Sequence, residues 1–269
     1  MNIVQAFILG IVQGLTEFLP VSSSGHLVIF EHILKTNLQD ISFDVFAHTG
    51  TLIAVIAFYR RDLINIARQL SGRILQSRPN REESDEIHSS WLWYIIIGSI
   101  PAAIIGLSFE ASISAAFKNV KLVGMILIFC GLMLISTIWA RRGKKAIDAP
   151  KALFIGIAQA LAILPGLSRS GTTITTGLFL GINPIRAADF SFLLSIPAVA
   201  GATILKLREA LSSAPFRGQI AAYVMGALAS LIVGYLSIAW MLAFIRKGKF
   251  FYFGVYCCLV GAGVLFFLS

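Results

Sequence analysis

Long runs of apolar residues, separated by short polar segments, dominate the chain. Six of these runs are long enough to cross a bilayer as helices, which rise about 1.5 Å per residue. They lie near residues 43–59, 91–109, 120–139, 187–205, 219–241 and 250–268. The pattern predicts an all-α integral membrane protein that forms a single membrane domain over residues 1–269.

Two further apolar regions, 1–35 and 151–185, are each interrupted in the middle by a cluster of Pro, Ser and Gly residues. The pieces on either side are too short to cross a hydrocarbon core of about 30 Å. We therefore expect two re-entrant helix–turn–helix regions that dip to mid-membrane and return. Irregular backbone at that depth is tolerated where it is buried in protein or lines a polar cavity.

The composition agrees with a membrane protein and excludes several other classes. Hydrophobic residues make up 57% of the chain, charged residues 13%, and the mean hydropathy is +0.83. The net charge of +9 comes from residues that flank apolar runs, so it does not indicate nucleic acid as a partner. The three cysteines lie in apolar runs, and we expect neither a disulfide framework nor a metal cluster from them. The N-terminus lacks the basic segment and cleavage site of a cleavable signal peptide.

The basic residues predict the topology. Of the 22 Lys and Arg residues, fifteen fall on one side of the alternating spans, six fall on the other, and the last is Arg169. The side with fifteen, which includes the polar loop 60–90, is predicted to be cytoplasmic, with both termini outside. The first re-entrant region then enters from outside and the second from inside. This is an inverted-topology repeat, with a first unit at 1–115 and a second at 116–269.

A polar motif occurs once in each re-entrant region. Residues 10–26 and 156–172 align without a gap at an offset of 146, with seven identical positions. Glu17 and His26 of the first copy have no equivalent in the second copy. Arg169 occupies the position that is equivalent to Ser23. A carboxylate, a hydroxyl and an imidazole from one copy thus meet a guanidinium from the other. Such a set suits attack on a phosphoryl group inside a membrane.

The serines after Pro20 are candidate nucleophiles at the start of a half-helix. Ser23 and His26 lie one helical turn apart on one face, a spacing that allows an activated Ser–His pair. Spacing alone does not decide which serine attacks. We favour Ser23, because Arg169 occupies its place in the other copy and the two side chains should converge. Ser22 and Ser24 are expected to cap the helix or to bind phosphate.

Glu17 is an ionisable group predicted near mid-bilayer, where such residues usually serve function. Its candidate roles are general base and metal ligand, and a structural ion pair with Arg169 is the alternative. Gln13 lies one turn earlier on the same face, so the two side chains can share a hydrated Mg²⁺ or Ca²⁺ through oxygen ligands. The set lacks the several His or Cys ligands that zinc requires.

Arg169 is the candidate phosphate ligand, since a guanidinium grips phosphate oxygens with two donors. The helix that follows presents free N–H groups and its positive dipole end. Side chains and backbone near this start complete the predicted anion site: Ser168, Ser170, Gly171 and Thr172. Three other polar residues in the spans either support the site residues or are buried groups satisfied by their neighbours, and we favour the second interpretation: Asp44, His48 and Asp189.

The combined motifs resemble those of a known family. Gln13-x-x-x-Glu17 leads into the segment Pro20-Val21-Ser22-Ser23-Ser24-Gly25-His26, and the second half contains Pro165-Gly166-x-Ser168-Arg169-Ser170-Gly171. This is similar to undecaprenyl-pyrophosphate phosphatases of the bacitracin-resistance type. The resemblance implies Mg²⁺- or Ca²⁺-dependent hydrolysis of a polyprenyl diphosphate to the monophosphate and phosphate. It also implies recycling of the carrier lipid for peptidoglycan synthesis, in the bacterial inner membrane.

In the predicted reaction the lipid head enters from the outer, periplasmic side. Ser23 attacks phosphorus with His26 or Glu17 as base, and direct attack by water is the alternative. A second function with the same inverted-repeat architecture is a polyprenyl-phosphate transporter or flippase. A rhomboid-like Ser–His protease is disfavoured, because it leaves Arg169 unexplained. A homodimer is left open, since no feature of the sequence supports it.

Overall fold

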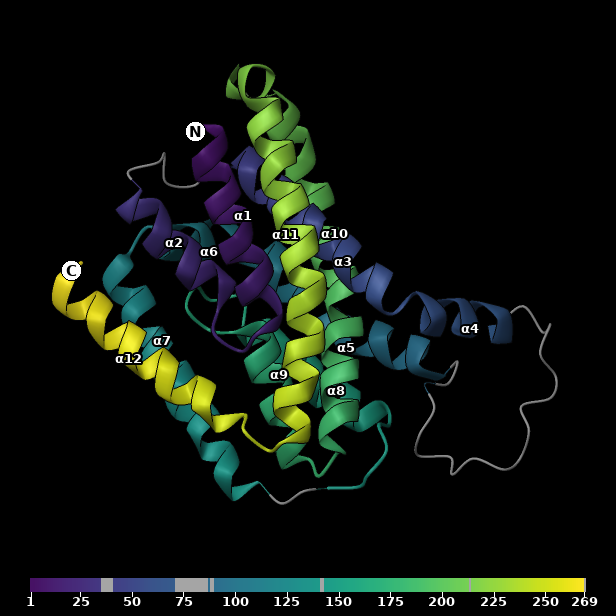
Figure 1. Ribbon diagram of the computed structural model, residues 1–269. Coiled ribbons are helices and arrows are strands. Elements are labelled where there is room, and N and C mark those ends of the chain that lie inside the picture. The colour runs from purple at the N-terminus through teal and green to yellow at the C-terminus, as the bar shows by residue number, and fades with distance from the viewer. Residues whose placement is uncertain (35–40, 71–86, 88–89, 141–142, 213, 269) are drawn as a thin grey trace.

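The computed structural model describes residues 1–34, 41–70, 87, 90–140, 143–212 and 214–268, and within these ranges the fold is helical (Figure 1). A short 3-10 helix, Ser136–Trp139, extends one α-helix. The α-helices are α1 (Ile3–Phe18), α2 (Ser23–Ile33), α3 (Ile41–Phe58), α4 (Arg60–Leu70), α5 (Ser90–Ser108), α6 (Glu110–Phe117), α7 (Val120–Ile135), α8 (Ala149–Leu161), α9 (Arg169–Phe179), α10 (Pro184–Ser212), α11 (Ala214–Arg246) and α12 (Phe251–Phe267).

Several helices are long and apolar enough to cross a membrane, so the chain is a multi-pass membrane protein. Within the described residues four qualify alone: Ser90–Ser108, Val120–Trp139, Pro184–Lys206 and Gln219–Arg246. They coincide with four of the expected spans. A fifth candidate is a pair, Ser42–Phe58 and Arg60–Gln69, bent by 66° at its break. The run at 250–268 forms α12, which is shorter than the other candidates. The full set of six spans stays a prediction.

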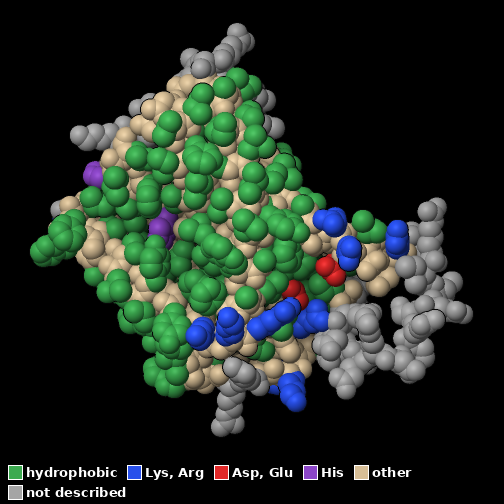
Figure 2. All heavy atoms as spheres, viewed as in Figure 1, with side chains coloured by type: hydrophobic (Ala, Val, Ile, Leu, Met, Phe, Trp, Pro, Cys, Tyr) green, Lys and Arg blue, Asp and Glu red, His purple; other side chains and the backbone are tan. Residues whose placement is uncertain are grey.

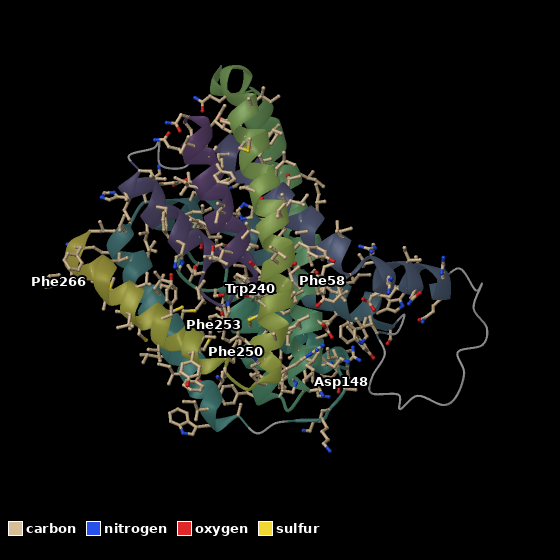
Figure 3. All side chains as sticks on the ribbon, in the orientation of Figure 1. Phe58, Asp148, Trp240, Phe250, Phe253 and Phe266 are labelled. Atoms are coloured by element: carbon tan, nitrogen blue, oxygen red, sulfur yellow. The ribbon has the colours of Figure 1, made fainter. Side chains whose placement is uncertain are left out.

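The expectation of a loop over 60–90 is wrong for its first part. Residues 60–70 form α4, which leaves the bundle at the bend after α3 (Figure 1). Its sequence alternates basic and apolar residues at helical spacing, so one face packs while the other meets water. Phe58 lies at the bend, against Tyr59 and Tyr235 with ring centroids 5.1 and 5.4 Å away (Figure 3). The remainder of the segment, apart from residues 87 and 90, lies outside the described residues.

Helices flank a break in both regions that carry the motif, as expected. Residues 19–22 join α1 to α2, and residues 162–168 join α8 to α9. α2 and α9 have the same length and begin 146 positions apart, which is the offset of the motif. Their starts are capped alike. The Ser22 hydroxyl accepts from the Gly25 N–H at 3.2 Å, and the Ser168 hydroxyl accepts from the Gly171 N–H at 3.1 Å.

Glycines lie where helices cross most closely. The first helix of each motif-bearing hairpin, α1 or α8, crosses its neighbouring helix in the same way. A methyl group built on Gly10 of α1 would lie 2.3 Å from the Gly226 carbonyl oxygen of α11. One built on Gly156 of α8 would lie 2.3 Å from the Gly98 carbonyl oxygen of α5. Since Gly10 and Gly156 are equivalent in the motif, the same backbone contact anchors both hairpins. Small residues at such crossings let membrane helices approach closely.

α7 and α12 form a second glycine-mediated pair and lie side by side (Figure 1). A methyl on Gly131 would lie 2.6 Å from the Gly254 oxygen, and one on Gly261 would lie 2.7 Å from the Gly124 oxygen. The two pairs run in opposite order, so the helices are antiparallel. At the α11–α12 junction Phe253 packs on Phe244 and Phe250, with centroids 5.1 and 6.5 Å away (Figure 3).

The surface carries the apolar side chains that a membrane span requires. Figure 2 shows hydrophobic side chains over most of one face, with Lys and Arg gathered along its lower margin and toward α4. Exposed aromatic residues such as Trp93, Trp240 and Phe266 contribute to this apolar surface. Large exposed apolar surfaces are rare in soluble monomers, so this face is suited to lipid.

Adding a methyl group at a hairpin crossing should destabilise the fold. Gly156→Ala forces the α8 and α5 backbones apart, and we expect a loss of about 1–3 kcal/mol of unfolding free energy. Gly201→Ala in α10 is the matched control, because a methyl there meets nothing within 4 Å. Thermal unfolding in detergent micelles measures both. Equal melting temperatures for the two variants would contradict the packing described.

Candidate active site

The tips of the two hairpins meet at one place. The Ser170 hydroxyl, at the start of α9, donates to the Leu19 carbonyl after α1 at 3.2 Å. A methyl group on Gly25 of α2 would lie 3.3 Å from the Cα of Gly166. Gly166 itself has φ +93°, a conformation that favours glycine. Motif positions far apart in the sequence therefore line a single site.

Glu17 lies at the centre of this site, and three side chains donate to its carboxylate. Arg169 donates through Nη2 to Oε1 at 2.5 Å. Oε2 accepts from the Ser23 hydroxyl at 2.6 Å and from Gln13 Nε2 at 3.0 Å. Glu17 is only 8% exposed, so these donors replace the water that the carboxylate would otherwise bind. The expected convergence of Ser23 and Arg169 is confirmed, and the Glu17 carboxylate joins them.

The Ser23–His26 pair that the spacing allows is not formed. His26 is 3% exposed, and both of its ring nitrogens have other partners. Nδ1 lies 2.9 Å from the Ser22 carbonyl oxygen, and Nε2 lies 2.8 Å from the Tyr256 hydroxyl. Ser22 has φ +70°, a strained conformation that aims its carbonyl at the first turn of α2. The hydrogen-bond acceptor of the Ser23 hydroxyl is instead the Glu17 carboxylate.

The predicted anion ligands surround the start of α9. Arg169 is its first residue, and Ser168 caps it. The Ser168 and Ser170 hydroxyls are 3.2 Å apart, and Thr172 donates back to the Ser168 carbonyl at 2.7 Å. Ser22 and Ser24 form a similar hydroxyl pair at 3.3 Å at the start of α2. The Thr172 hydroxyl is thus engaged in its own helix, whereas the two serine pairs stand at positive helix ends.

Two buried polar atoms of the site have no hydrogen-bond partner. They are Arg169 Nη1, a donor, and Gln13 Oε1, an acceptor. Buried polar atoms are rarely left unpaired, so both atoms are available to a bound molecule. A phosphate oxygen would satisfy the guanidinium, and a hydrated cation would satisfy the amide oxygen. The described residues contain no group of three His, Cys, Asp or Glu side chains placed for a metal. Gln13 and Glu17 therefore fit a cation whose other ligands are water and substrate oxygens.

The second copy lacks the charged group. Gln159 is equivalent to Gln13 and is 2% exposed, and both polar atoms of its side chain are unpaired. Ile163 stands where the first copy has Glu17. The acid of the site thus comes from one hairpin, and the second hairpin contributes Arg169.

Other polar residues of the spans have partners of their own. Asp189 accepts from the Tyr59 hydroxyl at 2.8 Å and from Arg186 at 3.3 Å, so its interpretation as a satisfied buried group is confirmed. His48 Nδ1 bonds to the Asp44 carbonyl oxygen at 2.8 Å. Tyr256 is the residue that sequence reasoning missed. It lies 230 positions from His26 in an apolar run, and no local pattern distinguishes it.

Fold and site together define an all-helical, multi-pass membrane protein with a buried centre of serine, carboxylate and arginine. The family model for bacitracin resistance protein BacA matches residues 6–263. This chain belongs to that family.

Named relatives match over nearly their whole length. The chain is 41% identical over 268 residues to the undecaprenyl-diphosphatase of Methanobrevibacter smithii. This match covers 97% of this chain and 96% of that protein. It is 41% identical over 276 residues to the undecaprenyl-diphosphatase of Geobacter metallireducens, and the match covers 100% of this chain and 99% of that protein. It is 35% identical over 268 residues to undecaprenyl-diphosphatase 3 of Bacillus anthracis, covering 99% and 98%.

The Glu17–Arg169 pair should behave as a coupled unit in stability measurements. Arg169→Met leaves a buried carboxylate, and Glu17→Gln leaves a buried guanidinium. We expect each single change to cost about 3–5 kcal/mol of unfolding free energy. The double variant removes both charges and should lose less than the sum. Denaturant unfolding in detergent measures the cycle, and strictly additive losses would contradict the pairing.

Proposed function

We propose that this protein hydrolyses undecaprenyl diphosphate to the monophosphate and inorganic phosphate. The observation that carries the proposal is the shared Glu17 carboxylate, which brings the Ser23 hydroxyl and the Arg169 guanidinium into one buried site. Family membership and the names of the relatives supply the lipid substrate. The same names give no support to a transporter or flippase.

The Arg169 guanidinium binds the diphosphate in this mechanism. Its unpaired Nη1 takes a phosphate oxygen, while Nη2 stays with Glu17 or turns to a second oxygen. The starts of α2 and α9 add backbone N–H groups and positive dipole ends. Fixed donors of this kind stabilise the charge that develops on the phosphoryl group in the transition state.

Ser23 is the nucleophile. Its oxygen attacks the terminal phosphorus while its proton passes to Glu17 Oε2, 2.6 Å away. The bond to the polyprenyl monophosphate breaks, and phosphoserine remains. Water then attacks phosphorus, phosphate leaves, and Ser23 recovers its proton from Glu17. That water gives its proton to His26, which passes it on to the departing phosphate. Direct attack by water, with Ser23 only positioning it, is the alternative.

A divalent cation, Mg²⁺ or Ca²⁺, belongs to the proposal as a partner of the substrate. Gln13 Oε1 and Glu17 are the side chains that would hold it. Bound there, a cation would neutralise charge on the diphosphate. The serines near the helix starts, Ser22, Ser24, Ser168 and Ser170, orient phosphate oxygens.

The same proposal includes the placement in the membrane. Both hairpins are re-entrant, the site opens to the outer side of the bacterial inner membrane, and both termini lie outside. The equivalent crossings at Gly10 and Gly156 support an inverted repeat. The helices α7 and α12 each carry two glycines at the same spacing, offset by 130 positions: Gly124 and Gly131, then Gly254 and Gly261. This match makes α7 and α12 equivalent, so each closes one repeat. It favours a first unit of α1–α7 and a second of α8–α12 over a division at residue 115. Hydrolysis there recycles the carrier lipid for cell-wall glycans and confers bacitracin resistance.

Phosphate release from undecaprenyl diphosphate by the purified protein tests the reaction. Wild type should release phosphate with Mg²⁺ or Ca²⁺ and stop when chelator is added. Glu17→Ala and Arg169→Ala should each lose about a thousand-fold or more in kcat/KM, because each change removes a group that acts in the transition state. A well-folded wild type without release would refute the proposal, and lipid movement in vesicles would then be measured.

Replacing single serines tests the nucleophile. Ser23→Ala should lower kcat by about a thousand-fold or more. Ser237→Ala is the matched control, since the Ser237 hydroxyl donates to the Val233 carbonyl within α11 and has no part in the site. Rapid quenching with radiolabelled substrate should trap a phosphoenzyme in wild type and in the control. A modest loss in Ser23→Ala, together with no phosphoenzyme in wild type, would replace the covalent mechanism by direct attack of water.

A further inference from the structure

The ring of His26 is held in one tautomer. The Ser22 carbonyl at Nδ1 only accepts hydrogen bonds, so Nδ1 carries a proton and donates. In the neutral ring Nε2 is then an acceptor, and the Tyr256 hydroxyl 2.8 Å away donates to it. The two rings also stack, with centroids 5.6 Å apart and planes 8° from parallel. Both the tautomer and the ring plane of His26 are therefore fixed.

Tyr256 belongs to a stretch of α12 that packs on the first hairpin tip. Its neighbour Cys257 donates from Sγ to the Pro20 carbonyl oxygen at 3.6 Å. His26 is 3% exposed, whereas Tyr256 is 44% exposed. The phenol thus lies between a buried imidazole and the protein surface.

The repeat shows which kind of side chain is enough to pack against a hairpin tip at the position of Tyr256. The glycines of α7 precede those of α12 by 130 positions, so Ile126 is the equivalent of Tyr256. Ile126 lies against the second tip, where a methyl on Gly166 would be 3.1 Å from its Cβ. An aliphatic side chain therefore suffices to pack a tip. The phenol occurs only where His26 is present, since the second copy has Thr172 in its place.

We propose that Tyr256 is a positioning residue for the phosphatase reaction and acts through His26. The inference rests on the proposed function. As water attacks the phosphoserine, the new O–P bond forms and the bond to Ser23 Oγ breaks. The Tyr256 hydroxyl swings off Nε2, the water proton passes to that nitrogen, and Glu17 returns its proton to Ser23. His26 then gives its Nε2 proton to the departing phosphate, and the Tyr256 hydroxyl donates to Nε2 again. It thus orients the imidazole before and after the transfer.

A kinetic double-mutant cycle tests this role. Wild type, Tyr256→Phe, His26→Gln and the double variant are compared for kcat and KM of phosphate release. Tyr256→Phe should lower kcat about ten-fold, as loss of an orienting partner does, and leave KM within about two-fold. It should add nothing in the His26→Gln background. Tyr252→Phe, one turn earlier on α12 and 52% exposed, is the matched control and should keep wild-type kcat.

Two kinetic results would overturn the proposal. One is a Tyr256→Phe variant with wild-type kcat, and the other is an equal loss in the wild-type and His26→Gln backgrounds. Melting temperatures of all variants identify any that fail to fold.

A spectroscopic measurement on wild type keeps the test independent of folding and of activity. ¹⁵N resonances of labelled histidine, assigned by comparison with His26→Gln, should report the Nδ1–H tautomer at His26. The opposite tautomer would overturn the inference even if the kinetic variants were unstable. A wild type that releases no phosphate would instead refute the proposed function, so the two failures are distinguishable.

Discussion

A buried carboxylate that needs partners is the constraint on which the rest of the structure depends. Glu17 gives up its hydration at the end of α1, and an unpaired charge in such a place is costly. Its cationic partner, Arg169, lies 152 positions away on the other hairpin. The two tips must therefore meet. The same charge, once a phosphate competes for Arg169, is free to accept the proton of Ser23.

The duplication separates the scaffold from the chemistry. Contacts shared by both halves are made by small residues, as at Gly10 and Gly156, and they fix how each hairpin crosses its neighbour. The groups that occur in one half only are polar, and they gather at the meeting point of the tips. The positions equivalent to Glu17, His26 and Tyr256 hold Ile163, Thr172 and Ile126. A symmetric frame thus holds an asymmetric site.

Much of this was predictable because the determinants are local or repeated. Apolar length predicted four spans, and the motif offset predicted that Ser23 and Arg169 converge. The partner of His26 was not predictable from spacing, since one helical turn places it near Ser23 but says nothing of the strained Ser22 carbonyl or of α12. Tyr256 lies within an apolar run, where a phenol resembles any other large side chain. The helix at 60–70 was missed because its many charges were interpreted as a loop.

The central claim is that both hairpins grip one phosphoryl group, with Ser23 in line for attack. A structure with orthovanadate, which adopts the five-coordinate geometry of phosphoryl transfer, tests it most directly. The account predicts vanadium bonded to Ser23 Oγ, with an equatorial oxygen on the Arg169 guanidinium and Glu17 beside the serine. Vanadate bound away from Ser23, or held by the first hairpin without Arg169, would contradict the account.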